Sequence, residues 1–138
     1  MKAIRLLLID DSVADTELTR ETLETNRMHV EIQSALDGAE ALEKLRDAHA
    51  SNRLPDLILL DLNMPRMDGR EFLSELRKNE ALRLIPVVIL TSSDAEQDVV
   101  KSYKLGANCY ATKPVGLSEF QSIVRSISDF WLTVVKLP

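Results

Sequence analysis

The sequence predicts an α/β protein built on a doubly wound, five-stranded parallel sheet with five helices. Three short runs are apolar at every position, as strands covered on both faces are: LLLI at 6–9, LILL at 57–60 and VVIL at 87–90. Stretches with helical spacing separate these runs, and parallel strands need crossover helices of that kind. The expected strand order is 2-1-3-4-5, in which strands 1 and 3 are neighbours.

Two weaker runs complete the strands. HVEIQ at 29–33 alternates apolar with polar residues and NCYAT at 108–112 is mixed, so both suit the edges of the sheet. The helices are recognised by apolar residues three and four positions apart. Those residues are Ala41, Leu42, Leu45 and Ala48; Phe72, Leu73 and Leu76; Ala95, Val99 and Tyr103; and Leu117, Phe120, Ile123, Val124, Ile127 and Trp131.

Length and composition indicate one globular domain, residues 1–138, with 45% hydrophobic and 28% charged residues. A net charge of −5 without a Lys/Arg cluster argues against a nucleic-acid partner. No apolar stretch approaches membrane-spanning length and the first residues do not fit a signal peptide, so we expect a cytoplasmic protein with no membrane contact. The single cysteine, Cys109, excludes an intrachain disulfide.

Polar side chains stand at the carboxyl ends of the three buried runs. Asp10 and Asp11 follow the first run, Asp61 follows the third strand, and Thr91 and Ser93 follow the fourth. The carboxyl ends of parallel strands meet at one edge of the sheet, and the winding reverses between strands 1 and 3, which opens a crevice there. We therefore expect the three carboxylates to meet in that crevice.

Three crowded carboxylates raise one another's pKa and destabilise a fold unless a cation lies among them. Ligands that are all oxygen select a hard ion, and an incomplete set leaves room for the waters and phosphate oxygens that Mg²⁺ prefers. The sequence therefore predicts a Mg²⁺ site, in which Mn²⁺ can substitute. The alternative is that Asp11 or Ser12 only caps the next helix, with Ser12 and Asp15 as a capping box. A cap needs one acceptor, however, and leaves Asp10 unexplained.

Lys113, in ATKPVG at 111–116, follows the fifth strand at the same edge as Thr91. Taken alone, a Lys-Pro pair usually means a solvated cation and the end of a strand. Its place at this edge favours an inward-pointing ammonium, and a cis Lys113–Pro114 bond is one way to aim it.

A carboxylate beside Mg²⁺, a lysine and a hydroxyl can attack a phosphoryl group and form an aspartyl phosphate. Asp61 is the candidate nucleophile because it stands alone at the end of its strand, whereas Asp10 and Asp11 form a pair suited to holding the metal. A backbone carbonyl near Asn63, in the following loop, is a further candidate ligand. Asp68-Gly69, at the end of that loop, indicates ordinary turn chemistry before a helix.

These motifs resemble the receiver domains of bacterial two-component response regulators. LLLIDDS, LILLDLNMPRMDG, VVILTSS and YATKP occur in that family's order and at its spacing, across essentially the whole chain. The resemblance implies a flavodoxin-like fold and Mg²⁺ bound by Asp10, Asp11, Asp61 and the Asn63 backbone carbonyl. It implies that a sensor histidine kinase phosphorylates Asp61, with Lys113 and Thr91 contacting the phosphoryl group. Such a domain is regulatory rather than an enzyme, and catalyses only its own phosphorylation and dephosphorylation.

The resemblance also implies a switch. Tyr110 stands where the family has an aromatic residue whose rotamer follows Thr91, which would carry the signal to the surface formed by the fourth helix, fifth strand and fifth helix. Simple packing of an edge-strand aromatic is the alternative. Asn63 and Ser93 flank the site at positions suited to tuning phosphoryl hydrolysis.

The chain departs from the commonest members in long links before strands 3 and 4 and in the tail DFWLTVVKLP, where residues 130–138 extend the last helix without an output domain. This combination resembles the small stand-alone regulators paired with phytochrome-type kinases, which implies an unknown downstream protein partner. The tail has more apolar surface than one helix face can bury, so we expect a homodimer through Phe130, Trp131 and Val134. Alternatively, the tail folds back over the domain.

Three other functions fit the sequence less well. A flavodoxin-like electron carrier needs a loop of Gly, Ser and Thr after strand 1, where two carboxylates would repel the flavin phosphate. A hydrolase with an aspartyl nucleophile generally needs a second carboxylate two residues later, where Asn63 stands. An interaction module that works without phosphorylation stays open, although every expected site residue is present.

Overall fold

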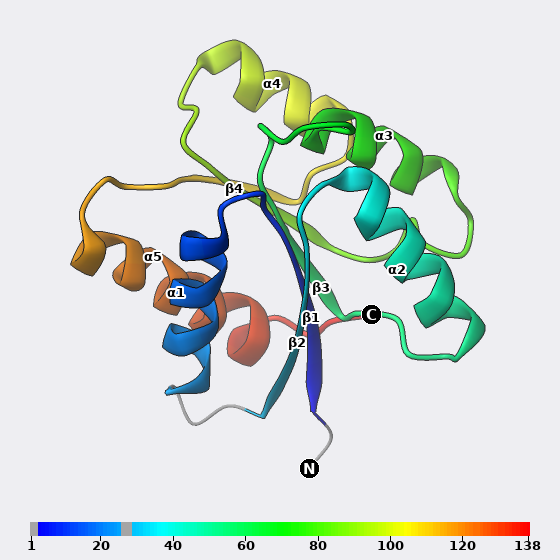
Figure 1. The fold of residues 1–138 in the computed structure, drawn as a ribbon, viewed down its shortest axis with the longest axis horizontal. Helices are drawn as coiled ribbons and strands as arrows, with labels where there is room; N and C mark the ends of the chain where they lie inside the picture. Colours follow the sequence, from blue (N-terminus) through cyan, green and yellow to red (C-terminus); the bar gives the residue numbers. More distant parts are fainter. Residues whose placement is uncertain (1–2, 26–28) are drawn as a thin grey trace.

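The computed structural model describes residues 3–25 and 29–138 and shows the predicted five-stranded parallel sheet in the order β2-β1-β3-β4-β5 (Figure 1). The strands are β1 Ile4–Ile9, β2 Val30–Ala35, β3 Leu57–Leu60, β4 Val87–Thr91 and β5 Cys109–Thr112. The helices are α1 Val13–Glu24, α2 Gly38–Ala50, α3 Gly69–Lys78, α4 Glu96–Lys104 and α5 Leu117–Asp129, and a π-helical turn, η1 Phe130–Val134, continues α5.

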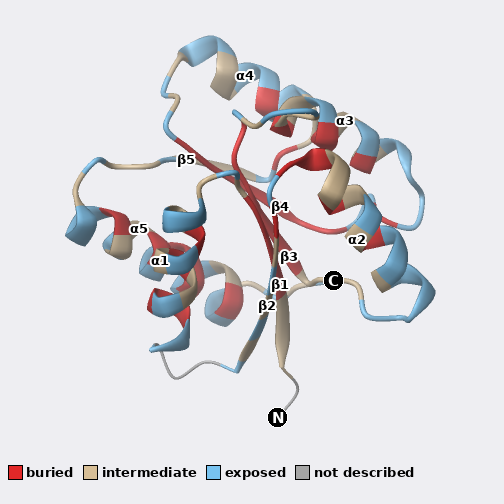
Figure 2. Ribbon diagram, viewed as in Figure 1, coloured by how far each residue is buried: buried red, intermediate tan, exposed pale blue. Residues whose placement is uncertain are grey.

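Helices cover both faces of the sheet, as the apolar runs require. Helices α2, α3 and α4 lie on one face and α1 and α5 on the other (Figure 1). Every residue of β3 and β4 is buried, and the sheet forms the centre of the molecule (Figure 2). Side chains that alternate along the strands divide the core into two clusters, one around Phe72 of α3 and one around Phe120 of α5.

The strand register brings the polar carboxyl ends together. Ile9 of β1 is paired with Leu60 of β3, and Leu60 with Ile89 of β4. The Asp61 N–H donates to the Ile9 carbonyl at 2.9 Å, so the residue that follows β3 starts beside the end of β1. Asp10 and Asp61 therefore leave adjacent strands at the same level.

Side-chain caps fix where three of the helices begin. The Ser12 hydroxyl accepts from the Asp15 N–H, Asp37 accepts from the Glu40 N–H, and Asp68 accepts from the Glu71 N–H. The cap of α1 predicted for Ser12 is thus present, and it leaves Asp10 and Asp11 available for another role. Asp68 does more than turn the chain, because it starts α3.

The apolar stripes predicted for α4 and α5 are wrong in part, because each includes a residue that is exposed. Leu117 begins α5 with 63% of its surface exposed, so the buried stripe of this helix starts at Phe120. Tyr103 is 49% exposed, and the buried residue of α4 is Ser102. Helix α4 packs on the edge strand β5 and has fewer buried residues than the other α-helices.

The described part of the chain contains no cis peptide bond, so the Lys113–Pro114 bond is trans. A cis bond, considered from the sequence, is not needed, since Lys113 reaches the crevice from a trans backbone. Among the described residues, no helix combines the length and the apolar character that crossing a membrane requires.

Candidate functional site

The three acidic residues expected at the sheet edge do meet. Asp10, Asp11 and Asp61 each offer an oxygen, and these oxygens all lie within 4.8 Å of one another. Asp61 is buried, Asp10 is partly buried and Asp11 is exposed, so the cluster opens to solvent on the side of Asp11. This crevice is the point where the winding of the sheet reverses.

Asp10 is held by two donors at once. Its Oδ1 accepts from the Ser12 N–H at 2.9 Å and its Oδ2 accepts from the Lys113 ammonium at 2.6 Å. Burial raises the pKa of Asp10 to about 6, and the nearby Asp61 adds to the rise, although the bonds from Lys113 and Ser12 oppose it. A cation in the crevice would favour the ionised form.

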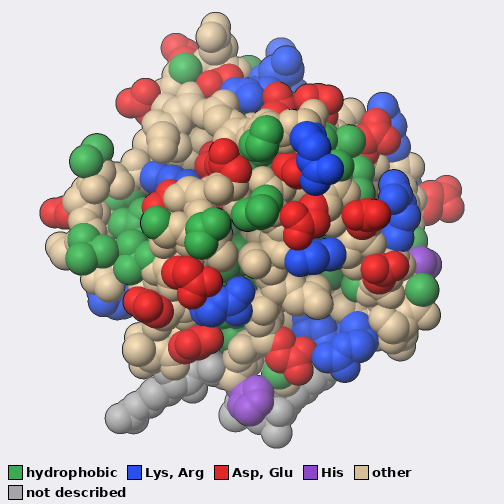
Figure 3. Space-filling model, in the orientation of Figure 1, with side chains coloured by type: hydrophobic (Ala, Val, Ile, Leu, Met, Phe, Trp, Pro, Cys, Tyr) green, Lys and Arg blue, Asp and Glu red, His purple; other side chains and the backbone are tan. Residues whose placement is uncertain are grey.

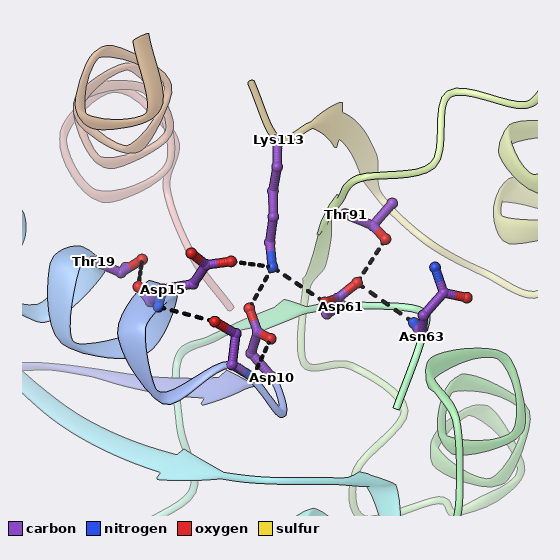
Figure 4. Close-up of polar contacts among 8 residues, drawn as sticks. Asp10, Asp15, Thr19, Asp61, Asn63, Thr91 and Lys113 are labelled. Carbon is purple, nitrogen blue, oxygen red and sulfur yellow. Dashed lines mark hydrogen bonds and ion pairs between the residues drawn. The ribbon is translucent and has the colours of Figure 1, made fainter. Parts of the chain in front are cut away.

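Lys113 extends from the end of β5 into the centre of the site (Figure 4). Its Nζ donates to Asp10 at 2.6 Å, to Asp15 at 2.8 Å and to Asp61 at 3.1 Å, and its side chain is only 6% exposed. Burial by itself lowers the pKa of the ammonium, but the bonds to Asp10 and Asp15 and the charges of Asp10 and Asp61 outweigh burial and raise it. Lys113 therefore remains a cation.

Asp61 lies between the lysine and a hydroxyl. Its Oδ1 accepts from the Thr91 hydroxyl at 2.6 Å, and its Oδ2 accepts from Lys113. The Asn63 N–H lies 3.4 Å from Oδ1, which places the start of the β3–α3 loop against the carboxylate. The Asn63 side chain is exposed, and the predicted role of its carbonyl as a ligand remains a prediction.

Gly69 is what allows the β3–α3 loop to return to Asp61. A Cβ at this position would lie 2.4 Å from the Asp61 carbonyl oxygen and 2.8 Å from the Leu62 Cα, so no larger residue fits without moving the backbone. The sequence places Gly69 in a turn. Its function in the structure is close packing of the start of α3 behind the acidic site.

A second polar network joins Tyr110 to the loop that follows Thr91. The Tyr110 hydroxyl donates to the Ser93 carbonyl at 2.7 Å, and the Ser93 hydroxyl donates to Asp98 of α4 at 2.6 Å. Arg70 of α3 contacts the other oxygen of Asp98 at 2.7 Å. Burial raises the pKa of Tyr110, which therefore stays a neutral donor. The Ser93 hydroxyl bonds within this network, and its predicted effect on hydrolysis stays a prediction.

Asp15 is the site residue that the sequence analysis missed. It was considered only as part of a helix cap, yet its carboxylate is one of the three that bind Lys113. The sequence shows Asp15 in the first turn of the helix that follows the acidic pair, but it does not show the contact with Lys113.

The donor set fits a divalent cation. All of the clustered side chains offer carboxylate oxygens, which are hard ligands, and the exposed side of the cluster leaves space for water or phosphate oxygens. Asp10, Asp11 and Asp61 are the residues that could hold the ion.

Comparison with known proteins agrees with this geometry. The family model described as the response regulator receiver domain matches residues 6–125, which includes Asp10, Asp11, Asp61, Thr91 and Lys113. The chain is a response regulator receiver domain. Receiver domains are regulatory.

Two relatives, one of them compared both by sequence and by structure, have the same extent as this receiver domain. Response regulator Rcp1 of Synechocystis sp. is 44% identical over 135 residues, which cover 96% of this chain and 92% of Rcp1. The structure of the phosphorylated cyanobacterial phytochrome response regulator RcpA superposes with a TM-score of 0.94 at 42% identity, covering 99% of each chain. The Mn²⁺-bound form of Rcp1 superposes with a TM-score of 0.90 at 44% identity, covering 98% of this chain and 99% of that one. The acidic cluster of this chain is consistent with the binding of a divalent metal.

Proposed function

We propose that this receiver domain is a phosphoacceptor and that Asp61 takes a phosphoryl group from a sensor histidine kinase. The observation that carries the proposal is the position of Asp61, which is buried between the Lys113 ammonium and the Thr91 hydroxyl. A carboxylate held by a cation and a hydroxyl beside an acidic cluster is arranged for nucleophilic attack on phosphorus.

The transfer needs positioning and charge neutralisation more than acid–base chemistry. An Asp61 oxygen bonds to phosphorus while the bond between phosphorus and the kinase histidine breaks, and the histidine nitrogen keeps the electron pair. Lys113 neutralises one phosphoryl oxygen, and the Thr91 hydroxyl, 2.6 Å from Asp61 in the structure, donates to another. The domain thereby assists its own phosphorylation and, with water, its dephosphorylation.

We propose Mg²⁺ as the metal, with Mn²⁺ able to replace it. Asp10, Asp11 and Asp61 would hold it, together with the Asn63 carbonyl. When bound, the ion supplies positive charge to the phosphoryl oxygens. The all-oxygen ligand set, open to solvent at Asp11, supports this choice because Mg²⁺ keeps several water ligands.

The signal would leave the site through Thr91 and Tyr110. A phosphoryl oxygen is a new acceptor for the Thr91 hydroxyl, and any movement of Thr91 displaces the loop whose Ser93 carbonyl holds Tyr110. That loop continues into α4, so the surface formed by α4, β5 and α5 would change with phosphorylation. Asn63 and Ser93, which flank Asp61 and Thr91, would tune how fast the phosphoryl group is hydrolysed.

The kinase is proposed to be of phytochrome type. Support comes from RcpA, whose structure is that of a cyanobacterial phytochrome response regulator and which superposes over 99% of both chains. Hydrophobic side chains gather on the left of the molecule in Figure 3, over the start of α5. Val115 and Leu117, in the loop before α5 and at its start, are exposed apolar residues on which a kinase could dock. We place this exchange in the cytoplasm and expect the output to be contact with a further protein.

We also propose a homodimer through the tail. Phe130 and Val134 are 52% and 72% exposed and lie one helical turn apart, so they form an apolar pair on the surface. Trp131 is half-buried against the domain's own core and makes an edge-to-face contact with Phe130, with ring centroids 5.7 Å apart. Trp131 would therefore orient Phe130 and contribute only its exposed part to the interface.

The acceptor assignment can be tested by mass. Incubation of the purified protein with Mg²⁺ and acetyl phosphate should add one phosphoryl group to the wild type and none to Asp61→Ala, because the nucleophile is gone. Asp68→Asn is a control, since Asn keeps the cap of α3 and Asp68 lies outside the acidic cluster; it should be phosphorylated like the wild type. A phosphoryl group on Asp61→Ala would overturn the assignment.

A further inference from the structure

The Lys113 ammonium uses all of its hydrogens on carboxylates. It has three N–H donors and three carboxylate partners, at 2.6 Å from Asp10, 2.8 Å from Asp15 and 3.1 Å from Asp61. Asp15 approaches from α1 on one side of Nζ and Asp61 from β3 on the other (Figure 4). The lysine therefore forms a bridge between the first turn of α1 and the end of β3.

Two of those three carboxylates are shared with the proposed metal site. Asp10 and Asp61 belong to the cluster that could hold a divalent cation, and Asp15 does not. A cation among those oxygens repels an ammonium bound to the same carboxylates, and like charges a few ångströms apart in a partly buried site interact strongly. The ammonium and the metal therefore compete for Asp10 and Asp61.

The ammonium cannot simply move into water. The Lys113 side chain is 6% exposed, so it needs a partner within the crevice, and burying an unpaired cation is costly. Asp15 is that partner, because its carboxylate already contacts Nζ and is 34% exposed. Its backbone is fixed by the cap of α1, in which the Asp15 N–H donates to the Ser12 hydroxyl.

We infer that Asp15 is a positioning residue that retains the Lys113 ammonium when a divalent cation takes over Asp10 and Asp61. It makes the two cations compatible in one crevice, and it keeps Nζ at the distance from which it can reach a phosphoryl oxygen. Without Asp15, Lys113 would bind only Asp10 and Asp61 and would oppose metal binding. The inference rests on the proposed metal site.

The test is a double-mutant cycle on Mn²⁺ affinity, measured by titration calorimetry and by the electron paramagnetic resonance signal of free Mn²⁺. The proteins are the wild type, Asp15→Asn, Lys113→Met and the double variant. Asn keeps an acceptor and removes the charge. Asp15→Asn should weaken Mn²⁺ binding at least about fivefold more in the wild-type background than in the Lys113→Met background, because direct attraction between Asp15 and the ion is common to both and cancels.

Glu17→Gln is the matched control. This variant removes one carboxylate from the same helix, and Glu17 is not among the carboxylates that contact Lys113. Because Glu17 is exposed, the change in Mn²⁺ affinity should be no more than about twofold. An equal loss from Asp15→Asn in both backgrounds would overturn the inference while leaving the metal site in place. A wild type that binds no Mn²⁺ would overturn the proposed metal site itself.

A second measurement avoids any change of the lysine. With ¹⁵N-labelled lysine and saturating Mg²⁺, the Lys113 ammonium should give a slowly exchanging signal in the wild type and in Glu17→Gln. In Asp15→Asn its exchange should be at least about tenfold faster, because the ammonium has lost the partner that the metal does not contest. Equally slow exchange in Asp15→Asn would contradict the inference.

Discussion

Asp37 is a buried carboxylate that lies outside the acidic cluster and joins two segments near it. It accepts from the Glu40 N–H at 2.9 Å, which caps α2, and from the Arg66 guanidinium at 2.7 Å. Arg66 lies in the loop that follows Asp61 and has a φ of 61°, a left-handed conformation that costs a non-glycine residue free energy. The ion pair stabilises that conformation and so holds the loop behind Asp61.

The free energy of unfolding should depend on pH through Asp37. Burial opposes its ionisation, but the bonds from Glu40 and Arg66 outweigh burial and lower its pKa below 3.8. A lowered folded-state pKa gives stability that is complete above the unfolded pKa and is lost as pH falls through the folded one. Asp37→Asn, which keeps the cap, should cost about 1–2 kcal/mol at pH 7 in urea unfolding, and the cost should shrink below pH 4.

Two variants separate the charge from the cap. Arg66→Gln should cost about as much as Asp37→Asn at pH 7, because it breaks the same ion pair. Asp37→Ala should cost about 1 kcal/mol more at every pH, because it also removes the cap. A loss in Asp37→Asn that is the same at pH 7 and at pH 3.5 would contradict this assignment.

At the scale of elements, Arg77 connects three segments on the α3 side of the sheet. Its guanidinium donates to the carbonyls of Gly106, Arg83 and Ile85 and to the Asn108 side chain. Gly106 and Asn108 lie in the turn between α4 and β5, and Arg83 and Ile85 lie in the linker before β4, so Arg77 joins both segments to α3. Burial lowers the pKa of Arg77. Gly106 has a φ of 103°, and a Cβ there would lie 2.8 Å from the Arg77 Nε, so the turn fits closely around the guanidinium.

Arg77→Lys should be strongly destabilising although it keeps the charge. Lysine cannot reproduce the planar fork of donors, so several partly buried carbonyls lose their partner, and we expect a loss of about 2–4 kcal/mol in urea unfolding followed by circular dichroism. Arg83→Lys, the same change at an exposed position of the linker, should stay within about 0.5 kcal/mol of the wild type. Similar stability of the two variants would show that the guanidinium does not hold the segments together.

At the scale of the whole molecule, the tail belongs partly to the domain and partly to its surface. Leu132 is 9% exposed, and Leu132 and Leu137 both pack in the core cluster around Phe120. The tail therefore folds back over the domain, which is one of the two alternatives expected from the sequence. Phe130 and Val134 nevertheless remain exposed, as the dimer alternative requires. The two alternatives are compatible, because Leu132 and Leu137 pack on the domain while Phe130 and Val134 stay exposed.

The proposed dimer can be tested without removing the tail. Replacing Phe130 and Val134 together by Glu should convert a dimer to a monomer in light scattering, because two charges would face two others across the interface. Both residues are exposed in the monomer, so the far-UV circular dichroism spectrum should stay that of the folded domain. Leu84→Glu, which changes a 74% exposed leucine elsewhere, should leave the mass unchanged. A wild type with the mass of a monomer would refute the dimer.

The sequence predicted the sheet and the positions of its site residues because each depends on a short-range pattern. Continuous apolar runs identify buried strands, and the residue directly after such a strand must lie at its carboxyl edge, so Asp10, Asp61 and Thr91 could be placed in advance. Residues whose role depends on tertiary packing could not be identified from the sequence. The contact of Asp15 with Lys113 joins positions 98 residues apart, and no local pattern encodes it.

Trp131 gives the molecule a built-in optical reporter. It is the single tryptophan of the chain, and it is half-buried beside Phe130 at the end of the last helix, while the acidic crevice lies at the opposite, carboxyl edge of the strands. Its emission should follow undocking of the tail or association of two copies, and should stay constant when events at the crevice do not reach that corner. Excitation at the red edge of indole absorption selects Trp131, so its fluorescence would show whether a change at the acidic crevice alters the structure around the tail.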